Sequence, residues 1–492
     1  MKCNWLWFGL ICTCAWWLGA GSASGQDWPQ WRGPNRDARA SGFNAPENWP
    51  TELTQKWKVT VGDGVATPAV VGNRVFVFTR EGGNEVIRCL NAENGERIWQ
   101  DQYEAESPRG GASRYPGPRS SPAVADGKVV TLGVQGALCC YDAQSGKQLW
   151  RKDEFDNEVP MFNVGSSPII VDSVVVAQLG GEDNGGIVAY DLATGAEKWR
   201  WEEDFPAYSS PVQMTINGKN VIVAVTNENL VAVGANDGKT VWEIPYQQGG
   251  RYNTITPIVA GDTLVVAGPG SGLTGLKITG QGEQADVERV WRNDENSLQF
   301  SSPVLKDRLL FGLTSAGQLF CVNTQSGETA WSVPLVPQAQ PQRREESVEN
   351  RRSNRVPVTL AQFVQQDGQP QRDRDERRGF QRDRRRGEGR GQFGEGRGRF
   401  GGGRGGRGGR RGGGSSGYGS VVDAGSVLLA LSPAGQLVVF RPNGEEYTEV
   451  ARYNVAEGGA DEPDKGTYAY PVAVGNSIYI KDGDSIARWD VN

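Results

Sequence analysis

The chain has 492 residues, among them 68 glycines and 16 tryptophans, with no histidine and a formal net charge of −6. The lack of histidine excludes Ser-His-Asp catalysis, histidine-ligated zinc and c-type haem attachment, because each needs an imidazole. Any enzyme built from this chain would depend on carboxylates, cysteines or a bound cofactor.

Residues 1–25 have the pattern of a secretory signal peptide: Lys2, an apolar stretch from Trp5 to Leu18, and a run of small residues. The stretch is shorter than the roughly 20 residues of a membrane-spanning helix, and no later stretch is long enough. We therefore expect an exported protein, periplasmic or secreted or peripheral to the outer membrane, with no transmembrane span in the mature chain. Residues 26–53 form an N-terminal extension, and we expect a monomer.

A repeated pattern begins after this extension. Its first mark is a Ser-Pro or Thr-Pro step that opens an apolar run, at residues 67–68, 121–122, 167–168, 210–211, 256–257 and 302–303, with variants at 420–421 and 470–471. Its second mark is a glycine four residues before a tryptophan. The tryptophans of the repeats are Trp99, Trp150, Trp199, Trp242, Trp291 and Trp331, of which Trp291 lacks the glycine.

Short β-branched runs and Gly, Asn and Asp turns separate these two marks, which predicts four short strands in each repeat. Eight such repeats predict an all-β protein, an eight-bladed β-propeller of four-stranded antiparallel blades. Residues 54–334 would hold blades 1–6, and residues 419–492 blades 7 and 8. The strand near Trp57 would join the last blade and close the ring, since that blade supplies only three strands of its own. We expect the repeat tryptophans to pack against the neighbouring blade.

The segments Tyr141–Trp150 and Ala189–Trp199 resemble the tryptophan-docking repeat of the quinoprotein (PQQ-like) β-propellers. The resemblance implies two classes of function. Some members are dehydrogenases that hold pyrroloquinoline quinone (PQQ) and calcium over the central channel, and others are non-enzymatic, such as BamB of the outer-membrane β-barrel assembly machinery. The carboxylate base and calcium ligands of the dehydrogenases find no residue-by-residue match in this chain.

Cys139 and Cys140 are adjacent, and some quinoprotein dehydrogenases carry a vicinal disulfide against the quinone. Here the pair lies within a predicted strand, whose neighbouring side chains point to opposite faces. We therefore favour two packed thiols.

The connections between blades should lie on one face of the ring, and binding residues concentrate on such loops. The residues that lead into the inner strand of each blade lie nearest the channel. Our candidates for contact with a ligand there are Arg119, Asn163, Tyr208, Arg251, Tyr252 and Tyr470. Each is also compatible with a purely structural role in its loop.

Residues 335–418 interrupt the repeats with an Arg/Gly-rich insertion. Between Arg372 and Arg411 there are 15 arginines and six acidic residues. This composition predicts disorder, and contact with a polyanion is one hypothesis for it, because guanidinium groups pair with phosphate and stack on bases.

The sequence thus favours a non-catalytic scaffold in the cell envelope with a protein partner, needing no cofactor and no metal. The alternatives are a PQQ- and calcium-dependent dehydrogenase acting on alcohols or sugars, and a binder of envelope polysaccharides or polyanions.

Overall fold

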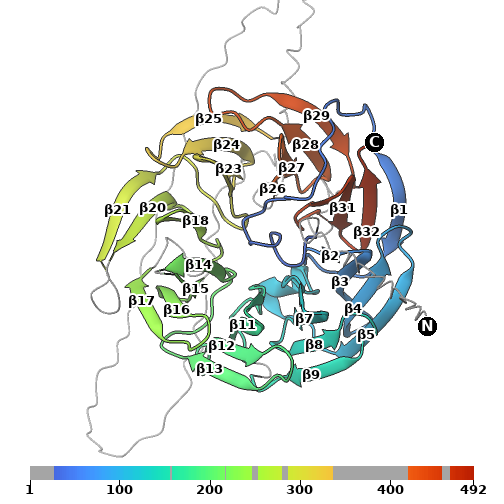
Figure 1. Cartoon of the computed structure of the whole chain (residues 1–492), viewed down its shortest axis with the longest axis vertical. Helices are drawn as coiled ribbons and strands as arrows, with labels where there is room; N and C mark the ends of the chain where they lie inside the picture. The colour runs from blue at the N-terminus through green and yellow to red at the C-terminus, as the bar shows by residue number, and fades with distance from the viewer. Residues whose placement is uncertain are drawn as a thin grey trace, which may run out of the picture. The chain divides into compact units, whose positions relative to one another are not determined.

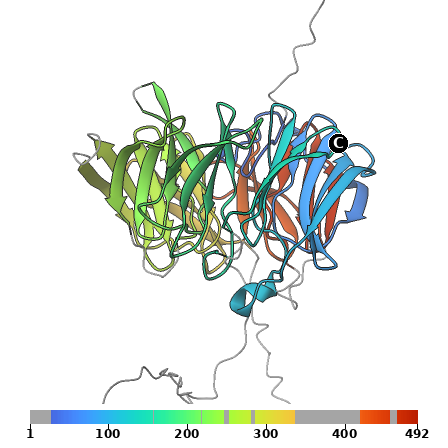
Figure 2. The same cartoon turned by 90° about the horizontal axis from the view of Figure 1, so that it is seen from below.

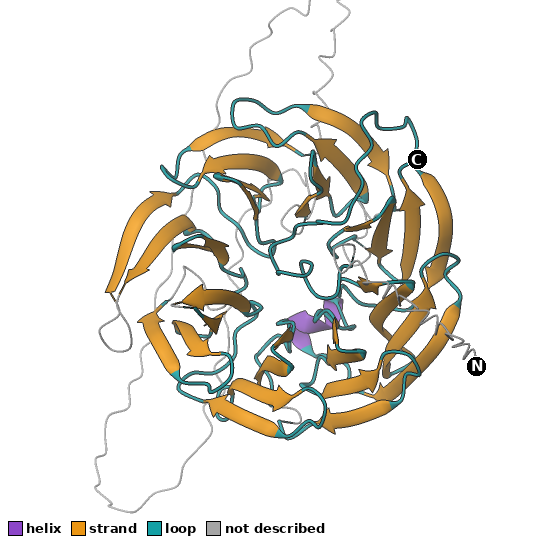
Figure 3. Cartoon of the chain, in the orientation of Figure 1, coloured by secondary structure: helices purple, strands orange, loops and turns teal. Residues whose placement is uncertain are grey.

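The computed structural model describes residues 27–155, 158–216, 218–246, 253–279, 286–335, 419–456 and 466–492. The predicted signal peptide and residues 336–418 of the predicted insertion lie outside the described residues. Within the described residues, the strands form eight four-stranded antiparallel sheets arranged as the blades of a propeller (Figure 1). Strands and loops make up nearly all of it (Figure 3). The prediction of an eight-bladed propeller is therefore confirmed.

Seven of the eight sheets run in chain order from an inner strand at the channel to an outer strand at the rim, and in the eighth the outer strand is the first strand of the chain. Blades 1 to 3 contain β2 (Ala69–Val71), β3 (Arg74–Glu81), β4 (Asn84–Asn91) and β5 (Arg97–Glu104); β6 (Ala123–Ala125), β7 (Lys128–Leu132), β8 (Leu138–Asp142) and β9 (Gln148–Lys152); β10 (Ile169–Val171), β11 (Val174–Leu179), β12 (Gly186–Asp191) and β13 (Glu197–Trp201). Blades 4 and 5 contain β14 (Val212–Ile216), β15 (Lys219–Val225), β16 (Asn229–Gly234) and β17 (Thr240–Pro245); β18 (Ile258–Ala260), β19 (Thr263–Gly268), β20 (Gly272–Thr279) and β21 (Asp286–Asn293).

The remaining blades follow the same order. Blades 6 and 7 contain β22 (Val304–Lys306), β23 (Leu309–Leu313), β24 (Gln318–Asn323) and β25 (Thr329–Pro334); β26 (Ser420–Asp423), β27 (Leu428–Leu431), β28 (Gln436–Phe440) and β29 (Glu449–Asn454). Blade 8 contains β30 (Val472–Val474), β31 (Ser477–Asp482), β32 (Ser485–Asp490) and, as its outer strand, β1 (Thr54–Thr60).

The pairing of β1 with β32 closes the ring, as the sequence predicted. The pairing is antiparallel and runs from Thr54 opposite Asp490 to Thr60 opposite Ser485. Because the ring is closed, every blade lies between two neighbouring blades. No blade therefore exposes a whole sheet face on which other chains could aggregate.

The middle strands are buried on both faces because each blade is packed between two others. All six residues of β11, for example, are buried. This explains why these strands are continuous apolar runs rather than alternating ones. The tight turns after the inner strands use Gly72, Asp126 and Asp172, all with positive φ, a conformation that glycine adopts freely and aspartate tolerates.

The two faces of the ring differ. The connections between blades lie on one face, where the short 3-10 helix η1 (Gly110–Arg114) projects (Figure 2). The opposite face carries the turns that follow the inner strands, and the N-terminal segment from residue 27 onward lies across the middle of the ring on that side (Figure 1). No helix in the described part of the chain is long and apolar enough to cross a membrane.

Candidate functional site

A belt of hydrogen bonds surrounds the channel at the Ser/Thr-Pro steps. The backbone N–H of each of these residues donates to the hydroxyl oxygen of the equivalent residue in the next blade. The pairs are Thr67 to Ser121 (3.0 Å), Ser121 to Ser167 (3.0 Å), Ser167 to Ser210 (2.9 Å), Ser210 to Thr256 (2.9 Å) and Thr256 to Ser302 (3.1 Å). The hydroxyl of the repeat is therefore a link between blades.

Tyr470, one of the predicted ligand contacts, completes this belt. Its backbone N–H donates to Thr67 Oγ1 at 3.0 Å, and its phenolic hydroxyl bonds both the N–H (3.3 Å) and the carbonyl oxygen (3.1 Å) of Ser302. Tyr470 belongs to blade 8 and Ser302 to blade 6, so the belt passes over blade 7. Tyr470 is buried at this position.

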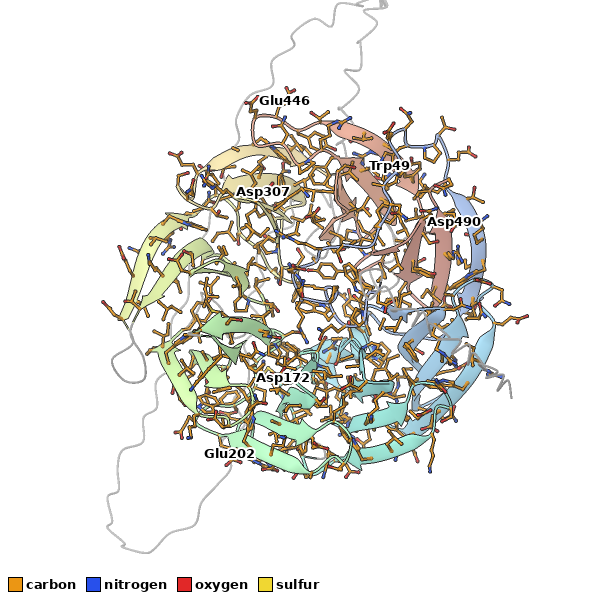
Figure 4. The ribbon with its side chains drawn as sticks, in the orientation of Figure 1. Trp49, Asp172, Glu202, Asp307, Glu446 and Asp490 are labelled. Carbon is orange, nitrogen blue, oxygen red and sulfur yellow. The ribbon has the colours of Figure 1, made fainter. Side chains whose placement is uncertain are left out.

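The N-terminal segment contacts six blades as it crosses the channel. Backbone bridges join Trp28 to Val70 of blade 1, Arg39 to Asp423 of blade 7 and Phe43 to Gly475 of blade 8, and the Val124 N–H of blade 2 donates to the Pro29 carbonyl. Trp49, labelled in Figure 4, continues the segment onto blade 7, where its ring centroid lies 6.2 Å from that of Tyr453. Blades 3 and 6 are reached by two arginines.

Arg36 and Arg32 enter the channel itself. Arg36 is 3% exposed and donates to the carbonyl oxygens of Pro168 (2.7 Å) and Ser167 (3.0 Å) in blade 3. Arg32 is fully buried and donates to the Pro303 carbonyl of blade 6 at 2.6 Å. The two guanidinium groups thereby connect opposite sides of the ring.

Neither guanidinium has a carboxylate partner among the described residues. Burial, with a smaller contribution from the neighbouring Arg32, lowers the pKa of Arg36 to about 9. The guanidinium carbons (Cζ) of Arg32 and Arg36 lie 5.6 and 5.4 Å from the ring centroid of Trp31. The face of the indole attracts both positive charges and so partly replaces a carboxylate counter-ion. The middle of the channel on this face is thus filled by the protein's own side chains.

On this face of the ring, the side chains in the channel do not fit a quinone and calcium site. In the described residues, no group of three or more Cys, Asp and Glu side chains is placed to hold a metal ion. The side chains that meet at the channel are two arginines, a tryptophan and a tyrosine, which offer no calcium ligands of the kind that carboxylates supply.

On the opposite face, Arg119, Asn163 and Tyr208 lie on connections between blades, as the sequence predicted for candidates at a channel mouth. Arg119 donates to the Phe162 carbonyl and, at 3.2 Å, to that of Ala112. The Tyr208 hydroxyl accepts the Phe162 N–H at 3.0 Å. These bonds gather Arg119 and Tyr208 around residue 162.

Asn163 is mostly buried, has φ +63° and donates from its amide to Gln135 Oε1 at 3.2 Å. Tyr470 lies deeper, in the belt described above. Arg251 and Tyr252 lie outside the described residues. Ligand contact by these candidates stays a prediction.

The tryptophans of the outer strands contact the next blade. The indole N–H groups of Trp99, Trp150, Trp199, Trp291 and Trp331 donate to the carbonyl oxygens of Ala143, Leu192, Ala235, Thr324 and Asn443, respectively. Trp242 packs in one cluster with Leu264 and Val266 of blade 5. Trp57 of the closing strand makes the same kind of bond to Ala92 of blade 1.

The glycine of the repeat is explained by these rings. At Gly146, where φ is +73°, an added Cβ would lie 2.6 Å from the ring of Trp99 in the preceding blade. The site therefore needs glycine both for its backbone conformation and for space.

Cys139 and Cys140 are free, buried thiols that point into different interfaces. Cys139 belongs to the apolar cluster between blades 1 and 2, and Cys140 to the cluster between blades 2 and 3. Burial raises the pKa of both thiols to about 12, so they are unreactive at neutral pH.

Sequence analysis missed Arg32, Arg36 and Trp31. The only signal was the concentration of Trp, Arg and Pro in residues 27–37, which carries no periodicity that would place it in the ring. Their role depends on contacts with residues more than 130 positions away.

Comparison with known proteins agrees with the fold. The family model described as "Outer membrane protein assembly factor BamB" matches residues 54–114 and 83–333. The outer membrane protein assembly factor BamB of Burkholderia pseudomallei is 23% identical over 50% of this chain and 70% of its own length.

The sequence alignments with quinoprotein enzymes cover a smaller share of each chain. The quinohemoprotein alcohol dehydrogenase ADH-IIG of Pseudomonas putida is 28% identical, over 39% of this chain and 26% of the enzyme. The crystal structure of the corresponding enzyme from Comamonas testosteroni superposes with a TM-score of 0.60 at 14% identity, covering 96% of this chain and 81% of that one, which shows a shared fold. Since the family model covers more than half of the chain, this protein belongs to the BamB-type family of PQQ-like β-propellers.

Proposed function

We propose that this protein is an exported, non-catalytic scaffold of the cell envelope that binds a protein partner, similar in role to the outer-membrane assembly factors among its relatives. Its place would be the periplasmic side of the outer membrane. The sequence alignment with BamB of Burkholderia pseudomallei covers 70% of that protein, whereas the sequence alignment with the dehydrogenase ADH-IIG covers 26% of that enzyme.

The observation that carries this proposal is the filled channel. Arg32, Arg36 and Trp31 occupy the middle of the channel on the face that carries the turns after the inner strands, where the two arginines bind blades 6 and 3. The hydrogen bonds of the two arginines stabilise the ring, and we propose that the partner binds to the loops and the rim.

A first experiment separates the scaffold from the dehydrogenase alternative. Purified protein would be titrated with PQQ and Ca²⁺ and followed by absorbance and by dye-linked alcohol oxidation, with a quinohemoprotein alcohol dehydrogenase as positive control. The scaffold predicts no saturable PQQ spectrum and no turnover. Stoichiometric binding with turnover would refute it.

A second experiment tests the envelope role. Deletion of the gene in the source organism should lower the amount of folded β-barrel protein in the outer membrane, and the wild-type gene should restore it. Unchanged levels of these proteins after deletion would contradict the assembly role.

A further inference from the structure

The interface between blades 4 and 5 contains a groove. The groove has a volume of about 300 Å³ and is lined by residues of both blades. Those used in the argument are Ile244, Tyr246, Leu276, Val287, Arg289 and Arg292. This volume is at the lower end of the range for ligand sites, roughly 300–1,000 Å³, and suits one large side chain.

Two other interfaces have an arginine at the corresponding position of the repeat, and there it stacks on an aromatic ring. The residue after the repeat tryptophan is an arginine in blades 2, 3 and 5. Arg151 of blade 2 stacks on the Tyr103 ring of blade 1 at 4.5 Å, and Arg200 of blade 3 stacks on the Phe155 ring of blade 2 at 5.1 Å. In both cases the guanidinium covers an aromatic ring of the preceding blade, at the end of its outer strand (Tyr103 in β5) or just after it (Phe155 after β9).

Blade 5 has the same arginine and blade 4 the same aromatic residue. Arg292 follows Trp291, and Tyr246 stands four residues after Trp242, as Tyr103 does after Trp99. Both line the groove, but Arg292 is ion-paired with Asp294 at 2.6 Å, and a cavity remains at this interface.

The sequence explains why the cavity is here. Position 287 is valine where five other repeats have the glycine that lies against the tryptophan ring of the preceding blade. In addition, β20 and β21 are eight residues long, longer than their counterparts in blade 4. The register places Val287, Arg289 and Arg292 opposite Ile278, Leu276 and Thr274, with a bulge at Val290. That bulge brings two arginines to the same groove.

The charge at the groove indicates the occupant. Arg289 is exposed, and within the described part of the chain it makes no ion pair or hydrogen bond. An apolar cavity beside a free guanidinium is complementary to an apolar side chain next to a carboxylate, since a guanidinium binds a carboxylate in bidentate geometry.

We propose that this groove is a docking site for an extended segment of a partner protein that carries one aromatic or large aliphatic side chain beside an acidic residue. The apolar side chain fills the cavity between Tyr246 and Leu276, and the carboxylate pairs with Arg289. The inference rests on the proposed scaffold function and assigns it a surface and a partner chemistry.

The test uses the full-length protein and a defined probe, a fluorescein-labelled heptapeptide with the central sequence Asp-Phe-Asp, measured by fluorescence anisotropy. Two control peptides replace either both Asp residues with Lys or the Phe with Ala. We expect saturable binding of the Asp-Phe-Asp peptide alone. Absence of saturable binding, or equal binding of the Ala peptide, would overturn the proposal.

Two charge-reversal variants locate the site. Arg289→Glu should raise the dissociation constant at least about tenfold, as expected for loss of a charge-assisted hydrogen bond, and should restore binding to the Lys-Phe-Lys peptide. Lys198→Glu makes the same charge change on the outer strand of blade 3 and should leave the constant within about twofold. Equal affinities of the two variants would refute the site. Both residues are exposed, so melting temperatures should match the wild type.

The outcome is independent of the gene-deletion experiment. If the peptide binds but the gene deletion leaves the outer membrane unaffected, the groove proposal is supported and the assembly role is refuted. Loss of outer-membrane proteins without peptide binding would do the reverse.

Discussion

The hydroxyl of Tyr470 lies 3.1 Å from the carbonyl oxygen of Ser302, and this contact joins blade 8 to blade 6 across the inner end of blade 7. Blade 7 is the one whose inner strand begins with Ser-Val in place of Ser/Thr-Pro. A tyrosine thus takes over in the belt where the repeat departs from its pattern.

Tyr470→Phe should lower the free energy of unfolding by about 1–3 kcal/mol, because the buried N–H of Ser302 loses its acceptor. The measurement is urea denaturation followed by tryptophan fluorescence. Tyr447→Phe is the matched control, since that hydroxyl bonds the solvent-accessible Glu449 and its loss should cost less than about 0.5 kcal/mol. Equal losses in both variants would show that the belt contributes nothing.

Trp31→Ala should destabilise the protein by about 3 kcal/mol, because both channel arginines lose the aromatic face that attracts them. Trp31→Phe keeps an aromatic face and should lose less than half as much. Thermal unfolding by calorimetry measures both. If Trp31→Ala unfolds like the wild type, the N-terminal segment does not hold the ring together.

The pair Gly146→Ala and Gly127→Ala separates steric clash from backbone strain within blade 2. Both glycines have similar positive φ, +73° and +69°, but only Gly146 lies against a tryptophan ring. Gly146→Ala should therefore cost about 1–3 kcal/mol more than Gly127→Ala in chemical denaturation. A cost that is the same at the two sites would mean that the ring shifts freely and that space is not the constraint.

Lys481 gives stability a pH dependence in alkaline solution. Its ammonium is buried and donates to the carbonyl oxygens of Gly64 (3.0 Å) and Gly483 (2.5 Å). Burial lowers its pKa from 10.5 to about 8, against the attraction of Asp482, Asp484 and Asp63.

Because the unfolded chain holds this proton up to a higher pH than the folded protein, the contribution of Lys481 to stability rises between pH 8 and 10.5. Relative to Lys481→Met, wild-type stability should therefore increase by on the order of 3 kcal/mol over this range. Denaturation of both proteins at several pH values measures the difference. Lys56→Met, at an exposed lysine, is the control and should give a plot of stability against pH that is parallel to that of the wild type. A parallel plot for Lys481→Met would show that the Lys481 ammonium is not buried.

The sequence by itself determined the number of blades and the closure of the ring. Trp99 and Gly146, or Trp150 and Gly195, belong to consecutive repeats, so each such contact recurs at a regular spacing and is visible as a pattern. The strand near Trp57 could be assigned to blade 8 because the last repeat lacks one strand and the chain has one extra strand before the first repeat.

The tertiary structure alone decided what fills the channel and where the ring departs from its repeat. Arg36 contacts Pro168, Arg32 contacts Pro303 and Tyr470 contacts Ser302, each across more than 130 residues. The groove between blades 4 and 5 is likewise lined by residues from two repeats, Val287 and Arg289 of blade 5 and Ile244 and Tyr246 of blade 4. These contacts occur once, so they leave no periodic trace, and they form only when the closed ring brings distant blades to a common axis or interface.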